Sequence, residues 1–197
     1  MQIALVLTLS RIVLSPIFIL LYLYYESWGI SLQVLPFLLL AILGLSELTD
    51  LLDGYFARKL NQVTDLGKVL DPMADSITRL SILFAFTSGI VNLPILLVLV
   101  FFYRDSFIST LRTLCALRGV ALSARISGKI KAVIQGLTVL VVLVAMACFA
   151  FGAITLKEFQ LLSFYVVLVA ALYTLLSGVE YLWAHRAAIK QAWTGKL

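Results

Sequence analysis

The sequence has little charge and few of the side chains that bind zinc or form disulfides. Only 13% of its 197 residues are charged, against roughly 25% in a soluble domain. It contains one histidine and two cysteines, Cys115 and Cys148, with no CxxC motif. These shortages exclude an ordinary soluble domain and disfavour a zinc or redox site, so we expect both cysteines to fill space in the core.

The sequence also lacks the signals of a cleaved signal peptide, of internal repeats and of domain linkers. No basic stretch precedes the first apolar segment and no cleavage site of small residues follows it. We therefore expect that segment to stay in the membrane rather than to be removed as a signal peptide. The chain contains no internal repeat, low-complexity tract or polar linker, and we expect residues 1–197 to form a single membrane domain.

Long uncharged apolar segments make up most of the chain. Hydrophobic residues account for 62% of the sequence, and its mean hydropathy is +1.08. A helix needs roughly 17 to 25 apolar residues to cross a bilayer, and the segment SGIVNLP divides the longest apolar stretch into two. We therefore predict an all-α integral membrane protein with six transmembrane helices, at residues 7–25, 30–57, 69–90, 94–114, 127–151 and 159–183.

Basic residues lie almost entirely on one side of this predicted topology. The loops after the second and fourth spans and the C-terminal tail contain Arg58, Lys59, Lys68, Arg118, Arg125, Lys129, Arg186, Lys190 and Lys196, whereas the opposite loops contain only Lys157. By the positive-inside rule, both termini face the cytoplasm. Contact with anionic lipid or an anionic substrate explains the formal net charge of +5, and we expect no nucleic-acid partner.

Four aspartates gather where the second and third predicted spans reach the cytoplasm. Asp50 and Asp53 end one span, and Asp71 and Asp75 begin the next. Spacings of three and four residues place each pair on one helical face, so two antiparallel helices can bring the pairs together. Such a cluster needs cations to offset its repulsion. Oxygen ligands suit Mg²⁺ or Mn²⁺ better than zinc, and we expect two ions, the arrangement that clamps a phosphoryl group.

Neighbouring residues suit the binding of a phosphate-containing ligand. Gly54 lacks a side chain directly after Asp53, which lets a ligand approach the helix backbone, and Gly67 can do the same on the facing segment. Arg58 lies one turn beyond Gly54 and can bind phosphate oxygens with its guanidinium group. Asp65 fits neither face of the cluster, and we expect it to be solvated in the polar loop.

Eight residues of this stretch form a specific pattern. Asp50, Asp53, Gly54, Ala57, Arg58, Gly67, Asp71 and Asp75 follow the order D-x2-D-G-x2-A-R-x8-G-x3-D-x3-D. This pattern resembles the signature of the CDP-alcohol phosphotransferase family. The resemblance implies a six-helix membrane fold in the inner membrane, an active site that faces the cytoplasm, and a homodimer. It also implies a reaction in which a CDP-linked donor gives its phosphoalcohol to a second alcohol and CMP leaves.

The resemblance also implies roles for these residues. Asp50, Asp53 and Asp71 would bind a pair of divalent ions, and Asp75 would share in metal binding and act as the general base. The donor-binding residues would be Asp50, Gly54, Ala57, Arg58 and Gly67. The catalytic task is consistent with this division, because phosphoryl transfer requires charge neutralisation and alignment more than covalent chemistry. The acyl chains of CDP-diacylglycerol would lie in a groove between helices that is open to lipid.

A second motif bears on the acceptor alcohol. Residues 104–135 carry Arg104, Asp105, Ser109, Arg112, Gly128, Lys129, Lys131 and Gln135 at spacings similar to those of family members that make phosphatidylglycerophosphate. We expect Arg112, Lys129 and Lys131 to bind the phosphate of glycerol 3-phosphate. Their alternative role is that of ordinary cytoplasmic anchors. Structural ion pairs are the alternative role of Arg104 and Asp105. We expect only packing roles for Thr174, Ser177, Gly178 and Tyr181 near the C-terminus.

Other functions remain open at the level of the sequence. The same chemistry can use serine, an inositol phosphate or phosphatidylglycerol as the acceptor, and an acceptor without a phosphate would not need the basic residues. A cation transporter also places carboxylates in the membrane, but it needs them along the whole depth of the bilayer. Here they lie at one end of the helices, which favours the enzyme.

Overall fold

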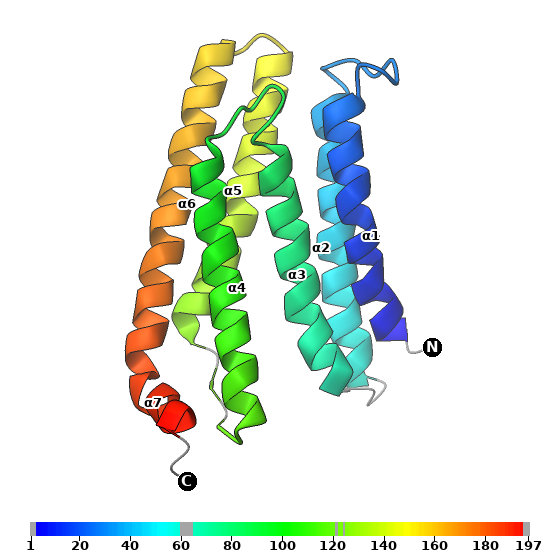
Figure 1. The fold of residues 1–197 in the computed structure, drawn as a ribbon. Helices are drawn as coiled ribbons and strands as arrows, with labels where there is room; N and C mark the ends of the chain where they lie inside the picture. The colour runs from blue at the N-terminus through cyan, green and yellow to red at the C-terminus, as the bar shows by residue number, and fades with distance from the viewer. Residues whose placement is uncertain (1–2, 60–64, 121, 124, 195–197) are drawn as a thin grey trace. The chain divides into compact units, whose positions relative to one another are not determined.

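The structure is a computed structural model that describes residues 3–59, 65–120, 122–123 and 125–194. Within these ranges it contains helices and no strand (Figure 1). The helices are α1 (Ile3–Tyr24), α2 (Leu35–Lys59), α3 (Asp65–Ala85), α4 (Ile95–Leu117), α5 (Ile126–Ala150), α6 (Leu156–Ala184) and α7 (Arg186–Thr194). The all-helical prediction is therefore confirmed, and each predicted span corresponds to one of the first six helices.

Among the described residues, four helices are long and apolar enough to cross a membrane, and the chain is a multi-pass membrane protein. The four candidate spans are Val6–Tyr24, Leu35–Gly54, Ile126–Ala150 and Leu156–Ala184. The helices α3 and α4 are of similar length, 21 and 23 residues. They are less apolar because α3 begins with a charged segment and α4 carries Arg104, Asp105 and Arg112.

Several helix boundaries in the structure differ from those predicted from the sequence. Pro36 lies in the first turn of α2, a position where a missing backbone N–H costs little, and α2 therefore begins at Leu35 rather than at residue 30. The helix α3 begins at Asp65, so the expectation that this residue lies in a loop was wrong. The short helix α7 was not predicted, because it follows α6 after a single residue, His185.

The described chain forms two compact units. Unit 1 contains Met1–Leu93 and Val139–Ser163, and unit 2 contains Pro94–Thr138 and Phe164–Leu197. Both α5 and α6 therefore contribute one end to each unit. The four aspartates belong to unit 1, whereas the three basic residues assigned to the acceptor belong to unit 2.

In unit 1, aromatic packing fixes the turn that follows α3. The rings of Phe18 and Tyr22 in α1 contact Phe86 edge-on, with centroid distances of 6.2 and 5.5 Å. The Tyr22 hydroxyl donates to the Ser88 carbonyl at 2.8 Å and accepts from the Val91 N–H at 3.2 Å. One side chain from α1 thus satisfies two backbone groups of the turn and holds α1 beside the end of α3.

In unit 2, α7 packs against α4 through a small apolar cluster. Leu111 and Cys115 of α4 are buried there, and Ile189 of α7 packs on them together with Val120, Leu122 and Leu182. Cys115 therefore fills space in the core, as expected. Cys148 is exposed, so the same expectation was wrong for it, because a membrane helix also places apolar side chains on its outer face, towards lipid.

The turn after α3 yields a stability prediction. Gly89 has φ +67°, and a Cβ atom there would lie 3.0 Å from the Tyr22 hydroxyl oxygen. Gly89→Ala should therefore combine backbone strain of roughly 1–2 kcal/mol with displacement of the Tyr22 hydroxyl. Gly119→Ala is the matched control, because Gly119 has φ +72° with nothing within 4 Å of its Cβ position. We expect a clearly larger drop in melting temperature for Gly89→Ala in detergent; equal drops would contradict the role of Tyr22.

Candidate active site

The four aspartates of the sequence motif meet at α1. Asp50 and Asp53 come from α2, and Asp71 and Asp75 come from α3. The Thr8 hydroxyl lies within hydrogen-bond distance of Asp53 Oδ2 (3.1 Å) and of Asp71 Oδ1 (2.9 Å). A residue of α1 therefore links one carboxylate from each helix, and the predicted convergence of the two pairs is present in the structure.

Arg11 is the centre of this cluster. One terminal nitrogen of its guanidinium forms ion pairs with Asp50 and Asp75, and the other lies 2.9 Å from Asp53 Oδ2. Only 2% of the Arg11 side chain is exposed. Sequence reasoning gave this residue no role in the site, although a lone arginine inside an apolar span is a signal of function or of a buried partner.

One aspartate of the cluster is buried, and two others are partly exposed and form its open side. The side chain of Asp53 is 6% exposed, whereas those of Asp50 and Asp75 are 39% and 31% exposed. Arg79, one turn after Asp75, lies 3.7 Å from its second carboxylate oxygen. A ligand would therefore reach the cluster past Asp50 and Asp75.

A second contact holds α1 against α3 just beyond the cluster. The Ser15 hydroxyl donates to the Thr78 hydroxyl at 3.1 Å and also lies 3.1 Å from the Arg11 carbonyl. Ser15 and Thr78 are both buried. These hydrogen bonds join α1 to α3 one turn beyond Arg11. They therefore fix the position of Arg11 along the helix axis relative to the two aspartates of α3.

The donor groups of the cluster fit a hard divalent cation. They are carboxylates and one hydroxyl, the oxygen ligands that suit Mg²⁺ or Mn²⁺, and they already face a positive charge in Arg11. In the conformation present, no group of three acidic, histidine or cysteine side chains among the described residues is arranged to hold a metal ion. The residue types therefore fit the ion, while several of their oxygens contact Arg11 and Thr8.

The predicted donor-binding residues are only partly described. Gly54 follows Asp53 in α2 and is partly exposed, as close approach of a ligand requires. Ala57 and Arg58 lie in α2 and Gly67 lies in α3, but the side chains of Ala57 and Arg58, and the surroundings of Gly67, lie outside the described part of the structure.

The predicted acceptor residues have different surroundings in unit 2. Arg112 Nε donates to the Tyr181 hydroxyl at 3.0 Å, and its guanidinium carbon lies 5.0 Å from the centre of the Tyr181 ring. Lys131 Nζ contacts both oxygens of Asp105, at 2.7 and 2.8 Å, in a buried ion pair. Lys129 is exposed. Tyr181, expected only to pack, therefore also orients Arg112.

Asp105 has a second cationic neighbour. Arg104 lies 3.0 Å from Asp105 Oδ1, and the side chains of these two residues are 11% and 8% exposed. A Cβ atom on Gly178 of α6 would approach Arg104 Cγ to 3.1 Å. The absence of a side chain at Gly178 thus lets α6 pack closely on Arg104, which accounts for a glycine within this helix.

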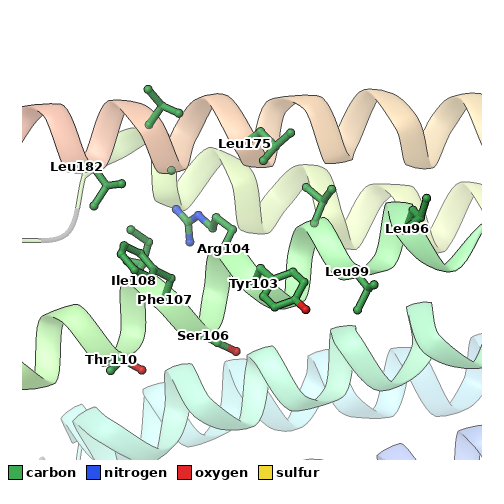
Figure 2. A pocket seen from close by; sticks show the side chains of 13 residues that line it. Leu96, Leu99, Tyr103, Arg104, Ser106, Phe107, Ile108, Thr110, Leu175 and Leu182 are labelled. Atoms are coloured by element: carbon green, nitrogen blue, oxygen red, sulfur yellow. The ribbon is translucent and has the colours of Figure 1, made fainter.

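An apolar pocket of about 800 Å³ lies beside this network, within unit 2. Figure 2 shows side chains of α4 and α6 that line it, among them Leu99, Phe107 and Leu175. Of the described residues that line it, only Arg104 is charged. The pocket has the apolar character expected of a groove for acyl chains, and it lies on helices that the sequence places in the membrane.

Comparison with known proteins identifies the family. The model of the CDP-alcohol phosphatidyltransferase family matches residues 1–156. Proteins named CDP-diacylglycerol--glycerol-3-phosphate 3-phosphatidyltransferase are similar to the chain over most of its length. The one from Bacillus subtilis is 33% identical over 192 residues, 93% of this chain and 94% of that protein. The one from Escherichia coli K12 is 32% identical over 187 residues, 92% of this chain and 93% of that protein.

A shorter match agrees with these two. The protein of the same name from Rickettsia typhi is 35% identical over 131 residues, 66% of this chain and 68% of that protein. The family match includes all four aspartates together with Thr8 and Arg11 of α1. The resemblance inferred from the sequence is confirmed, and the chain belongs to the CDP-alcohol phosphatidyltransferase family of enzymes.

Proposed function

We propose that this protein transfers the phosphatidyl group of CDP-diacylglycerol to glycerol 3-phosphate, giving phosphatidylglycerophosphate and CMP. The observation that carries the proposal is the convergence of four aspartates, in the order of the family signature, on Arg11 and Thr8 of α1. The names of the full-length relatives support glycerol 3-phosphate as the acceptor. The reaction belongs to phospholipid synthesis.

The proposed topology has six membrane spans, formed by α1 to α6. The helices α3 and α4 complete the set because their 21 and 23 residues are long enough to cross. Basic residues then lie on the side of both termini, which assigns that side to the cytoplasm. The aspartates lie at the same ends of α2 and α3, so a water-soluble acceptor reaches them directly from the cytoplasm.

In the proposed mechanism, Asp50, Asp53 and Asp71 hold two divalent ions, Mg²⁺ or Mn²⁺, together with Asp75. When bound, such ions neutralise charge on the donor diphosphate and on the phosphoryl group in transfer. Asp75 takes the proton from the acceptor hydroxyl as it attacks the donor phosphorus, and CMP leaves from the opposite side. The partial exposure of Asp75 suits this role, because an acceptor arriving from water can touch it.

The donor is proposed to bind with its nucleotide near the motif and its acyl chains in lipid. Asp50, Gly54, Ala57, Arg58 and Gly67 are the proposed donor contacts, as in the family pattern. The diphosphate then lies over the open side of the aspartate cluster. The apolar pocket on α4 and α6 supports a lipid substrate, because its lining accepts hydrocarbon and offers only one charged group. A homodimer is proposed from family resemblance.

The acceptor phosphate is proposed to bind to cationic side chains of unit 2. Arg112 presents a guanidinium held by Tyr181, and Lys129 presents an exposed ammonium. Lys131 already pairs with Asp105, so its proposed contribution is positive charge close to the phosphate and a firm link between α4 and α5. Arg104 and Asp105 complete that link.

The general-base role predicts a large and specific loss of turnover. Asp75→Asn should reduce CMP release from CDP-diacylglycerol by a factor of at least about 10², because the acceptor proton then has no base. Asp65→Asn is the matched control, since it makes the same chemical change in the same helix at a position outside the eight-residue motif, and it should retain most activity. CMP release by purified protein with Mg²⁺ or Mn²⁺ measures both; near-normal turnover of Asp75→Asn would contradict the assigned base.

The choice of acceptor is tested with the same assay. Parallel reactions contain glycerol 3-phosphate, serine, inositol phosphate or phosphatidylglycerol, and we expect CMP release only with glycerol 3-phosphate. Release with another acceptor would keep the aspartate chemistry and overturn the proposed acceptor. No release with any of them, in protein shown to be folded, would count against the donor.

Lys129 and Lys131, both in α5, should have different roles. Lys131→Met leaves Asp105 with one cation fewer in a buried site and should lower stability by about 3 kcal/mol. Lys129→Met should change stability by less than about 0.5 kcal/mol, because Lys129 is exposed, but it should raise KM for glycerol 3-phosphate. Thermal unfolding and steady-state kinetics distinguish the pair. A stable Lys131→Met protein would show that the pair with Asp105 contributes little.

A further inference from the structure

Arg11 and the divalent ions are drawn to the same aspartates. The Arg11 guanidinium contacts Asp50, Asp53 and Asp75, three of the four groups to which the proposed function assigns metal binding. It uses one oxygen of each, and Thr8 also lies within hydrogen-bond distance of the Asp53 oxygen that Arg11 contacts. In this arrangement the described acidic groups offer no set of three that can hold an ion.

The cluster requires a positive charge in every state. Four carboxylates held by two helices repel one another, and Arg11 and Arg79 both form ion pairs with members of the cluster. Arg79 touches only Asp75, at 3.7 Å, from the same helix. Arg11 joins two carboxylates of α2 to a carboxylate of α3, so its charge helps to keep the two helices together.

The Arg11 side chain that supplies this charge is buried. Only 2% of the Arg11 side chain is exposed, and its charge has no access to bulk water while it remains at the cluster. Its Nε atom is buried without a hydrogen-bond partner in the described structure. The guanidinium is therefore held by its two terminal nitrogens alone, and all three of their contacts are with the carboxylates that a divalent ion would take.

We infer that Arg11 is a positioning residue that serves as the resident counter-ion of the metal-free site, and that divalent ions bind by taking carboxylate oxygens from it. This inference rests on the proposed metal binding by the four aspartates. The state in which Arg11 is engaged keeps the cluster folded but lowers apparent metal affinity, because affinity falls in proportion to the population of the competent state.

Competition between Arg11 and divalent ions for the carboxylates predicts a change in metal affinity that a purely structural arginine would not give. Arg11→Gln removes the competing cation while keeping a polar side chain of similar length. The metal-free variant should melt well below the wild type, because its carboxylates then repel one another. Its affinity for Mn²⁺ should rise by about tenfold or more, as expected when a competent state populated at 10% or less becomes dominant. Saturating Mn²⁺ should restore most of the lost melting temperature.

Two further variants isolate the cause. Arg79→Gln removes an equal charge that contacts only Asp75, so it measures the effect of charge alone and should tighten Mn²⁺ binding far less than Arg11→Gln. Arg11→Lys keeps the charge but cannot bridge three carboxylates with one planar group. It should fold more readily than Arg11→Gln and show a smaller increase in affinity, which keeps the inference testable if Arg11→Gln does not fold.

The experiment is Mn²⁺ titration of the purified full chain in detergent, followed by electron paramagnetic resonance of free Mn²⁺, with thermal unfolding of the same samples with and without Mn²⁺. Asp53→Asn of the wild-type chain is included to show that the bound Mn²⁺ is at the cluster. The expected result is tighter Mn²⁺ binding by the Arg11 variants and a larger stabilisation by Mn²⁺ than in the wild type.

Two other outcomes have distinct meanings. If the wild type binds Mn²⁺ through Asp53 but the Arg11 variants bind it equally or more weakly, Arg11 supports the metal site instead of competing with it, and the inference is overturned while the proposed function stands. If the folded wild type binds no Mn²⁺ that depends on Asp53, the proposed metal site fails and the inference falls with it.

Discussion

The repulsion among four carboxylates at one end of two helices is the constraint around which unit 1 is built. Two unit charges 4 Å apart interact by about 4 kcal/mol at an effective dielectric constant of 20, so several like pairs together would force α2 and α3 apart. Arg11 and Thr8 offset that repulsion from α1. The first helix is therefore part of the candidate active site rather than only an anchor, and its contacts with both other helices follow from electrostatics as much as from apolar packing.

In unit 2 the excess charge is positive rather than negative, and a carboxylate offsets part of it. There a single buried carboxylate, Asp105, lies between Arg104 and Lys131, which leaves an excess of positive charge. A buried ion pair adds little net stability compared with an apolar core, but breaking it is costly. The network thus holds buried positive charge in unit 2, as the proposed binding of an acceptor phosphate requires.

The sequence predicts the helices and the carboxylate cluster well, because both depend on local patterns. Apolar length indicates the spans, and spacings of three and four residues place Asp50 with Asp53 and Asp71 with Asp75 on shared faces. What it could not predict are pairings across long separations. Arg11 meets Asp75 from 64 residues away, and Lys131 meets Asp105 from 26 residues away. Each depends on helix packing, which a one-dimensional pattern does not specify, and the outward orientation of Cys148 is of the same kind.

Charge balance at the cluster also links metal binding to donor binding in the proposed reaction. The four aspartates with Arg11 and Arg79 leave two net negative charges, which one divalent ion neutralises. A second divalent ion would bring two uncompensated positive charges into a partly dehydrated site, which is unfavourable. The diphosphate of CDP-diacylglycerol supplies two negative charges at that position. The second ion and the donor should therefore bind with positive coupling, and by reciprocity each raises the affinity for the other by the same factor.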